Sequence, residues 1–264
     1  MVDTPKTELT GTDRDAALAA ADAAVEPATL EAMVKAGVLY GRAKRKTNPK
    51  MGKYIFMTRS GIEIIDVTQT LALIDAAADF LAGALAGRGN VLVAGTTPAA
   101  RDLARAFAVR LNCSSVTNRW LGGTLTNFKV ISARIQHFLK LRADRDGGKL
   151  SQYTKKERLE FDRDIERMAT LFTGLENMTT LPQALLVIGA SAHETALREA
   201  RQLNIPIVAL LSTDADPTAV RYPIPAGDTA RSSIAWVLDR LASRIETRRT
   251  ELAAAVQAAA PKAE

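Results

Sequence analysis

A basic segment between Gly37 and Gly61 carries residue types suited to binding a polyanion. It holds seven Lys or Arg residues and no acid, and the next acid in the chain is Glu63. Tyr40, Tyr54 and Phe56 lie among these cations, so one segment supplies charge for phosphates and flat rings for packing or stacking. Residues 1–36 contain seven acids and three bases, so the positive charge is concentrated. The pattern favours contact with nucleic acid over a solvated charged face.

The expected contacts within this segment are its cations and one amide side chain. They are Arg42, Lys44, Arg45, Lys46, Asn48, Lys50, Lys53 and Arg59. The cations would pair with phosphates, and the amide would add a hydrogen bond.

A second segment, TNRWLGGTLTNFK at 117–129, combines a Trp, a Gly pair and two flanking cations. It reads as a tight loop before a helix, with Trp120 as its hydrophobic plug. Arg119 and Lys129 could also face a phosphate backbone. We interpret the Trp and the glycines as architecture and the two cations as candidate RNA contacts.

A competing hypothesis is an α/β enzyme acting on a phosphorylated or metal-bound small substrate. The Gly95 turn in VAGTTPAAR follows a predicted strand, where parallel sheets often hold phosphates, but it lacks the other glycines of a dinucleotide site and the Lys of a P-loop. Asp214 and Asp216 in TDADP could hold Mg²⁺, although this spacing before Pro217 is more typical of a turn. We therefore expect no catalytic residue.

Composition limits the remaining classes of function. The chain has 264 residues, 47% of them apolar, and a net charge of +6, which suits a full core and an acidic partner. One cysteine, Cys113, and two histidines leave little material for a metal site, so we expect no metal and no cofactor. No apolar run reaches about eighteen residues, so we expect no membrane contact. Residues 1–28 lack the apolar core of a signal peptide, and we expect them to form a mobile tail. Together these features predict a cytoplasmic protein.

Short apolar runs alternate with helical patterns along most of the chain. VLVAGTT (91–97), ALLVIG (184–189) and IPIVALL (205–211) predict buried strands, and YIFMT and IEIID predict a hairpin. Helices are expected from Thr29 to Gly37, after a Thr68 cap, after a Thr97 cap with Pro98, over 193–203, and near the C-terminus. This order predicts an α/β fold, a doubly wound and mostly parallel sheet with flavodoxin- or Rossmann-like layers.

The middle third departs from this alternation. Apolar residues recur at helical spacing from Phe128 to Phe138 and again from Phe161 to Leu175, with a Gly147-Gly148 break between the two stripes. We expect an inserted, protruding antiparallel helical hairpin, a coiled coil, over 128–178. It divides an α/β domain into 29–127 and 179–252, and 253–264 form a C-terminal tail. Charged outer faces on the hairpin would supply further RNA contacts from Arg134, Lys155, Lys156 and Arg158.

Two motifs in order along the chain, GVLYGRAKRKTNPKMGKYIFMTRSGIEIID and NRWLGGTLTNF, resemble those of the bacterial small-subunit ribosomal protein two family. KKE at 155–157, LPQALLVIG and IPIVALLSTDADP extend the resemblance, which covers about Leu30 to Arg248. It implies a doubly wound sheet with a helical hairpin, and a non-catalytic place in the small subunit near the junction of head and body. There such a protein binds rRNA and helps to dock neighbouring ribosomal proteins, including protein one.

Carried over residue by residue, the basic stretch of the family matches Arg42 to Lys53, and its tryptophan loop matches Arg119 to Asn127. Three positions depart from the family pattern: Arg42 and Asn118 stand where His is usual, and Gly189 where an acid is usual. These departures count against a metal site sometimes suspected in such proteins.

Overall fold

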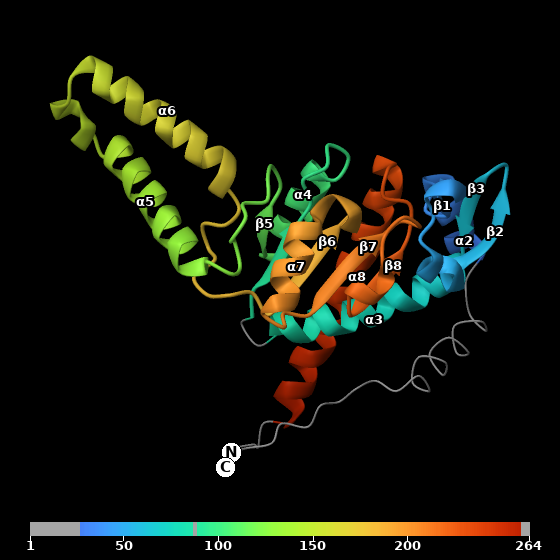
Figure 1. Ribbon diagram of the computed structural model, residues 1–264. Coiled ribbons are helices and arrows are strands. Elements are labelled where there is room, and N and C mark those ends of the chain that lie inside the picture. Colours follow the sequence, from blue (N-terminus) through green and yellow to red (C-terminus); the bar gives the residue numbers. More distant parts are fainter. Residues whose placement is uncertain (1–26, 87–88, 260–264) are drawn as a thin grey trace, which may run out of the picture.

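The computed structural model describes residues 27–86 and 89–259 of the chain (Figure 1). The expected N-terminal tail over 1–28 therefore lies almost entirely outside the described residues, as do residues 260–264. The first described helix is α2 (Pro27–Ala36), which ends at Gly37 as predicted, because Gly37 adopts a φ of +82° that favours glycine.

A five-stranded parallel sheet forms the centre of the molecule, with strand order β5-β4-β6-β7-β8. The strands are β4 (Val91–Ala94), β5 (Ser114–Val116), β6 (Ala184–Ile188), β7 (Ile207–Leu211) and β8 (Tyr222–Pro225). In order of appearance this is 2-1-3-4-5, the flavodoxin-like order of doubly wound sheets. The α/β class and the predicted strands β4, β6 and β7 are confirmed, whereas β5 and β8 were not predicted.

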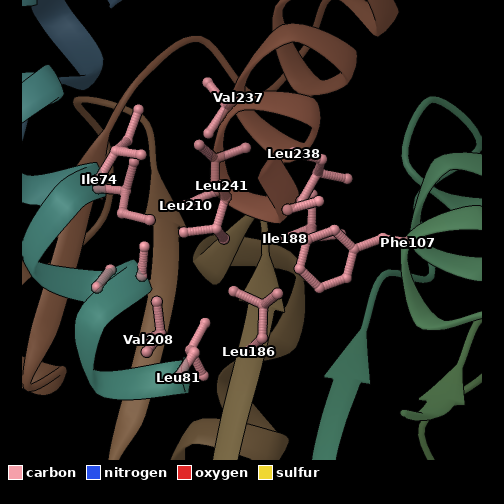
Figure 2. Packing of buried hydrophobic residues seen from close by; sticks show 14 of the residues in the cluster. Ile74, Leu81, Phe107, Leu186, Ile188, Val208, Leu210, Val237, Leu238 and Leu241 are labelled. Atoms are coloured by element: carbon pink, nitrogen blue, oxygen red, sulfur yellow. The ribbon is translucent and has the colours of Figure 1, made fainter. Parts of the chain in front are cut away.

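Both faces of this sheet are covered, so the strands β4, β6 and β7 are apolar at every position. Val91 and Val93 point to one face, and Leu92 and Ala94 point to the other. On the first face lie α2, α3 (Val67–Ala86), α4 (Arg101–Leu111) and α8 (Arg231–Ala259). Figure 2 shows how side chains of α3, α4 and α8 meet those of β6 and β7 there. The other face packs against α7 (Glu194–Gln202) and the residues around α5.

At the N-termini of α3 and α4 the structure differs from the two predicted helix caps. Asp66, not Thr68, caps α3, since its Oδ1 accepts a hydrogen bond from the Thr68 backbone N–H at 3.0 Å. The helix α4 begins at Arg101 rather than at Pro98, and it is the Thr97 carbonyl that accepts from the Arg101 N–H at 2.9 Å.

Within the described residues, α3 is long and apolar enough to suit a membrane span by length and composition. Its setting is that of a core helix, because Ile74 and Leu81 are buried against the sheet and α8. Two aspartates on α3, Asp75 and Asp79, form ion pairs with Arg244 and Arg248 of α8. The helix α8 itself continues to Ala259, past residue 253, where a tail was expected to begin.

A second, three-stranded antiparallel sheet carries the basic segment. Its order is β1-β3-β2, with β1 (Tyr40–Ala43), β2 (Ile55–Arg59) and β3 (Ile62–Ile65). The predicted β2–β3 hairpin is confirmed, and it turns through Ser60 and Gly61, both with positive φ. Two 3₁₀ turns, η1 (Lys44–Lys46) and η2 (Pro49–Tyr54), join β1 to β2.

Between β5 and β6 the chain forms α5 (Phe128–Asp146) and α6 (Lys155–Phe172), with a 3₁₀ turn, η3 (Lys149–Gln152), between them. The two helices lie side by side, run in opposite directions and extend away from the sheet (Figure 1). Phe138 of α5 and Phe172 of α6 meet with ring centroids 6.4 Å apart, and both are buried. The apolar stripes read from the sequence therefore lie in the contact between these helices.

Candidate nucleic-acid interface

The basic segment is fixed to the carboxyl end of β7 by backbone contacts. The Arg42 N–H donates to Thr213 Oγ1 at 2.8 Å, and the Asn48 N–H donates to the Thr213 carbonyl at 2.8 Å. The approach is close enough to require glycine at position 41, because a Cβ there would lie 2.5 Å from Thr213 Cγ2. The chain between these anchors must therefore bulge away from the sheet, and it carries η1 outward.

The Arg42 side chain has internal partners. Its Nη2 lies 2.9 Å from Asp228 Oδ1, and its Nε lies 3.7 Å from Asp214 Oδ2. Burial raises the pKa of Asp228, the Arg42 charge opposes that rise, and the nearby Asp214 adds to it. Arg42 therefore pairs with the buried Asp228 and lies near the partly exposed Asp214, a role that the basic run did not indicate.

Lys50 is also paired, through the TDADP turn. Its Nζ lies 2.7 Å from Asp216 Oδ2 and 3.2 Å from Thr218 Oγ1. These bonds from Lys50 and Thr218 lower the pKa of Asp216 to about 2. Asp216 also caps its own turn by accepting from the Thr218 N–H, and the Asn48 side chain accepts from the Lys50 N–H. The turn interpretation of TDADP thus agrees with the geometry, and Asn48 caps η2.

The other five cations of the segment are exposed, and none has a carboxylate at ion-pair distance among the residues that the structure describes. We call them the basic turn: Lys44, Arg45, Lys46, Lys53 and Arg59. Lys53 Nζ lies 4.8 Å from the centroid of the Tyr54 ring, so this aromatic residue serves as a support for a cation.

The remaining predicted cations lie at the other end of the molecule. We call the helical ones the arm cations: Lys129, Arg134, Lys155, Lys156 and Arg158. They and Arg119 in the loop before α5 are all exposed. The helices α5 and α6, which we call the arm, leave the sheet on the β5 side, whereas β1, β2 and β3 lie beyond β8 (Figure 1). The structure therefore divides the predicted site residues into two groups on opposite sides of the sheet.

Glu199 of α7, which sequence reasoning missed, organises the tryptophan loop. Its carboxylate accepts from Trp120 Nε1 at 3.0 Å, the Gly123 N–H at 2.9 Å and the Leu125 N–H at 3.0 Å. Burial alone would raise the pKa of Glu199, but the bonds from Trp120, Leu125, Gly123 and Thr126 together lower it. The sequence offered one signal for a buried role of Glu199, since this acid lies on the same short helix as Ala196 and Ala200, which are buried.

Comparison with known proteins identifies the family. A family model described as ribosomal protein S2 matches residues 33–247, from α2 into α8. The chain belongs to the ribosomal protein S2 family.

Named relatives agree with this assignment and cover most of the chain. The small ribosomal subunit protein uS2 of Bifidobacterium animalis subsp. lactis is 40% identical over 218 residues, which are 82% of this chain and 72% of the relative. The protein of the same name from Salinispora arenicola is 41% identical over 203 residues, 76% of this chain and 73% of the relative. The protein of this name from Sorangium cellulosum is 39% identical over 216 residues, which are 82% of this chain and 78% of the relative. The resemblance drawn from the two motifs is confirmed.

In this member of the S2 family the Gly95 turn has a structural use. A Cβ at Gly95 would lie 2.8 Å from the Ala104 Cβ, so the glycine permits close packing of β4 against α4. The Thr96 N–H donates to His193 Nε2 at 3.1 Å, which makes Nε2 the acceptor and leaves Nδ1–H to donate to the Gly189 carbonyl at 2.8 Å. The features on which the enzyme hypothesis relied are thus occupied by internal contacts, and the family assignment makes the chain a structural, non-enzymatic protein.

Proposed function

We propose that the chain is a structural constituent of the small ribosomal subunit in the cytoplasm and binds rRNA near the junction of head and body. The observation that carries the RNA contact is the basic turn, since its five cations are exposed and have no carboxylate partner within the described structure. Unpaired cations on a fixed loop are suited to phosphates, which position a protein on folded RNA without reading base edges. No cofactor and no small-molecule substrate enter this proposal.

Arg42 and Lys50 have a supporting role in this proposal. Their ion pairs with Asp228 and Asp216 hold the chain on either side of η1 against the carboxyl ends of β7 and β8. The cations between them are thereby presented from a fixed position, which lowers the entropy lost when RNA binds. We assign the phosphate contacts first to Lys44, Arg45 and Lys46.

The arm cations form the second contact. We infer that α5 and α6 act as a projecting coiled-coil arm over 128–178, inserted into an α/β domain formed by 29–127 and 179–252. Lys155 and Lys156 occupy the first turn of α6, where the helix dipole disfavours positive charge. Helix stability does not explain their position, and a polyanionic partner does. Exposed apolar residues on the arm, Val130 and Leu159, support contact with neighbouring ribosomal proteins, including protein one.

The test of rRNA binding is neutralisation of the basic turn. The variant Lys44→Gln, Arg45→Gln, Lys46→Gln should weaken co-sedimentation with small subunits and reduce the slope of log affinity against log salt by about 2 to 3, because three phosphate contacts are lost. The matched control, Arg198→Gln, Arg201→Gln, Arg221→Gln, removes the same charge from exposed positions outside both groups and should leave the slope unchanged. Equal slopes for the two variants would refute the assignment.

A deletion of the arm distinguishes protein binding from RNA binding. Removing residues 130–176 should abolish binding to neighbouring ribosomal proteins while RNA binding through the basic turn largely persists. Loss of all RNA binding in a deleted protein that still melts cooperatively would contradict this division.

A further inference from the structure

One face of the three-stranded sheet exposes apolar and aromatic side chains together. Tyr40 pairs with Ile64 across β1 and β3, and Met57 pairs with Ile64 across β2 and β3, so these side chains share a face. Ile62 lies two residues before Ile64 and therefore points the same way. Tyr40, Met57 and Ile62 are 51%, 49% and 42% exposed, respectively, which is high for neighbouring apolar residues.

A bulge in β2 places a second exposed ring next to Met57. The register shifts between Ile55 and Met57, which inserts Phe56 as an extra residue opposite β3. Phe56 is 72% exposed, the highest value among the exposed aromatic residues of the described structure. Tyr40 lies beside Gly37, since its Cδ2 would be 3.6 Å from a Cβ built there. The sheet thus exposes two aromatic rings, Tyr40 in β1 and Phe56 in β2.

The charges around this face have one sign. Arg59 pairs with Ile62 and shares its face, and the η1 cations are joined to the β2–β3 turn by the Lys44 N–H, which donates to the Gly61 carbonyl at 2.9 Å. The one acid of the sheet, Glu63, is 4% exposed, lies on the opposite face and accepts from Thr58 Oγ1. An occupant of this surface should therefore combine flat or apolar groups with negative charge, since none of the strand residues of β1, β2 and β3 places a carboxylate on this face.

We infer that this face binds unpaired RNA bases, which stack on Tyr40 and Phe56 while Arg59 and the η1 cations hold the adjoining phosphates. The inference rests on the RNA-binding role proposed above and adds to it a single-stranded segment as the bound form. Aromatic rings beside a cationic groove are a general means of binding single strands, because every base offers a flat face. The cations beside the β2–β3 turn favour such a strand over an apolar protein segment, whose affinity would come from the apolar area alone.

The test compares two probes on the full-length chain. One is a single-stranded RNA of about ten nucleotides, within the usual site size for such proteins, and the other is an abasic strand of the same length and charge. The double variant Tyr40→Leu, Phe56→Leu keeps apolar side chains but removes both rings. It should lose at least about fivefold in affinity for the RNA probe and nothing for the abasic probe, because stacking on a ring contributes about 1 to 3 kcal/mol per base. Val109→Ala, at a 77% exposed position on α4, is the control and should bind both probes like the unchanged chain.

The outcomes separate this inference from the proposed function. If the leucine variant binds the RNA probe like the unchanged chain, or loses equally on both probes, base stacking is refuted. The basic-turn variant should lose affinity for both probes, and unchanged binding there would refute phosphate contact itself. Normal RNA binding by the leucine variant, combined with poor incorporation into small subunits, would assign the face to a protein and overturn the inference.

Discussion

At the scale of single residues, carboxylates brought from distant parts of the chain decide what each cation of the basic segment does. Arg42 meets Asp214 and Asp228, and Lys50 meets Asp216. Lys44, Arg45 and Lys46 meet none of the described acids and face solvent. Residues of one type, a few positions apart, thus divide into internal anchors and outward contacts.

Replacing Arg42 should test the anchor. Arg42→Ala leaves Asp228 buried without its partner, so we expect a loss of about 2 kcal/mol, since breaking a fully buried pair costs about 3 to 5 kcal/mol and Arg42 keeps 30% of its side chain exposed. The pKa of Asp228, already raised by burial, should rise further. Protonation removes the penalty of leaving a buried carboxylate unpaired, so the deficit should shrink as pH falls through the raised folded pKa of Asp228. Urea unfolding across pH measures this, and Arg42→Ala with Asp228→Asn should recover part of the loss.

The acceptor role of Glu199 also predicts a deficit that depends on pH, but here the folded pKa is lowered and not raised. Glu199→Gln removes the charge that accepts from Trp120, Gly123 and Leu125 and should cost about 1 to 3 kcal/mol at pH 7. The folded pKa of Glu199 is lowered, so its contribution is present above the unfolded pKa of about 4.3 and is lost as pH falls through the folded pKa. Urea unfolding of both proteins should therefore converge in acid. A deficit that is independent of pH would contradict the charged acceptor.

At the scale of elements, α6 starts with a capping box that fixes the tip of the arm. Thr154 Oγ1 accepts from the Glu157 N–H, and the Glu157 carboxylate accepts from the Thr154 N–H at 2.9 Å. Lys155, Lys156 and Arg158 lie in the turn that this box closes. The cap therefore sets the position of three of the five arm cations, Lys155, Lys156 and Arg158.

Removing the cap should loosen this turn without unfolding the molecule. We expect Thr154→Ala to cost about 1 kcal/mol locally, because it leaves a helix N–H without its partner. Hydrogen exchange at the start of α6 should accelerate severalfold, while exchange in β6 and β7 stays unchanged. Thr250→Ala on α8, which removes a side chain that bonds only the preceding turn, is the control.

Elements were predictable where burial or periodicity was unambiguous. The β4, β6 and β7 strands are continuous apolar runs, and the stripes of α5 and α6 repeat at helical spacing. The β5 strand was missed because Ser114–Val116 is short and polar. The β8 strand was missed because Pro223 and Pro225 argue against a strand, yet β8 is an edge strand, where proline is tolerated.

At the scale of the whole molecule, charge is displayed on two sides of one rigid sheet. The sequence allowed both groups of cations to be found, because runs of one sign are visible in one dimension. It did not allow the anchors to be told from the contacts, since Asp228 and Arg42 are far apart along the chain. Glu199 was missed for the same reason, as its partners lie in the loop 120–126.

The separation of the two groups predicts additive binding. Neutralising Lys44, Arg45 and Lys46 and neutralising Lys155, Lys156 and Arg158 should each weaken binding to small-subunit rRNA. The combined variant should show the sum of the two free-energy losses within about 0.5 kcal/mol, because distant sites that share no partner act independently. Filter binding at fixed salt measures all three variants. A combined loss well below the sum would show that both groups contact one RNA element.

The contact between Thr96 and His193 has a consequence for the fold itself. In sheets with this strand order the notch between the first and third strands, here β4 and β6, ordinarily seats a nucleotide. Here the His193 imidazole lies at that position and accepts the hydrogen bond of the Thr96 N–H, a backbone amide that a phosphate would otherwise use. Burial lowers the pKa of His193, so protonation below about pH 6.5 works against the folded arrangement, because a charged ring can no longer accept the Thr96 N–H. The switch point of this sheet is thus closed by an internal contact that protonation of His193 would break.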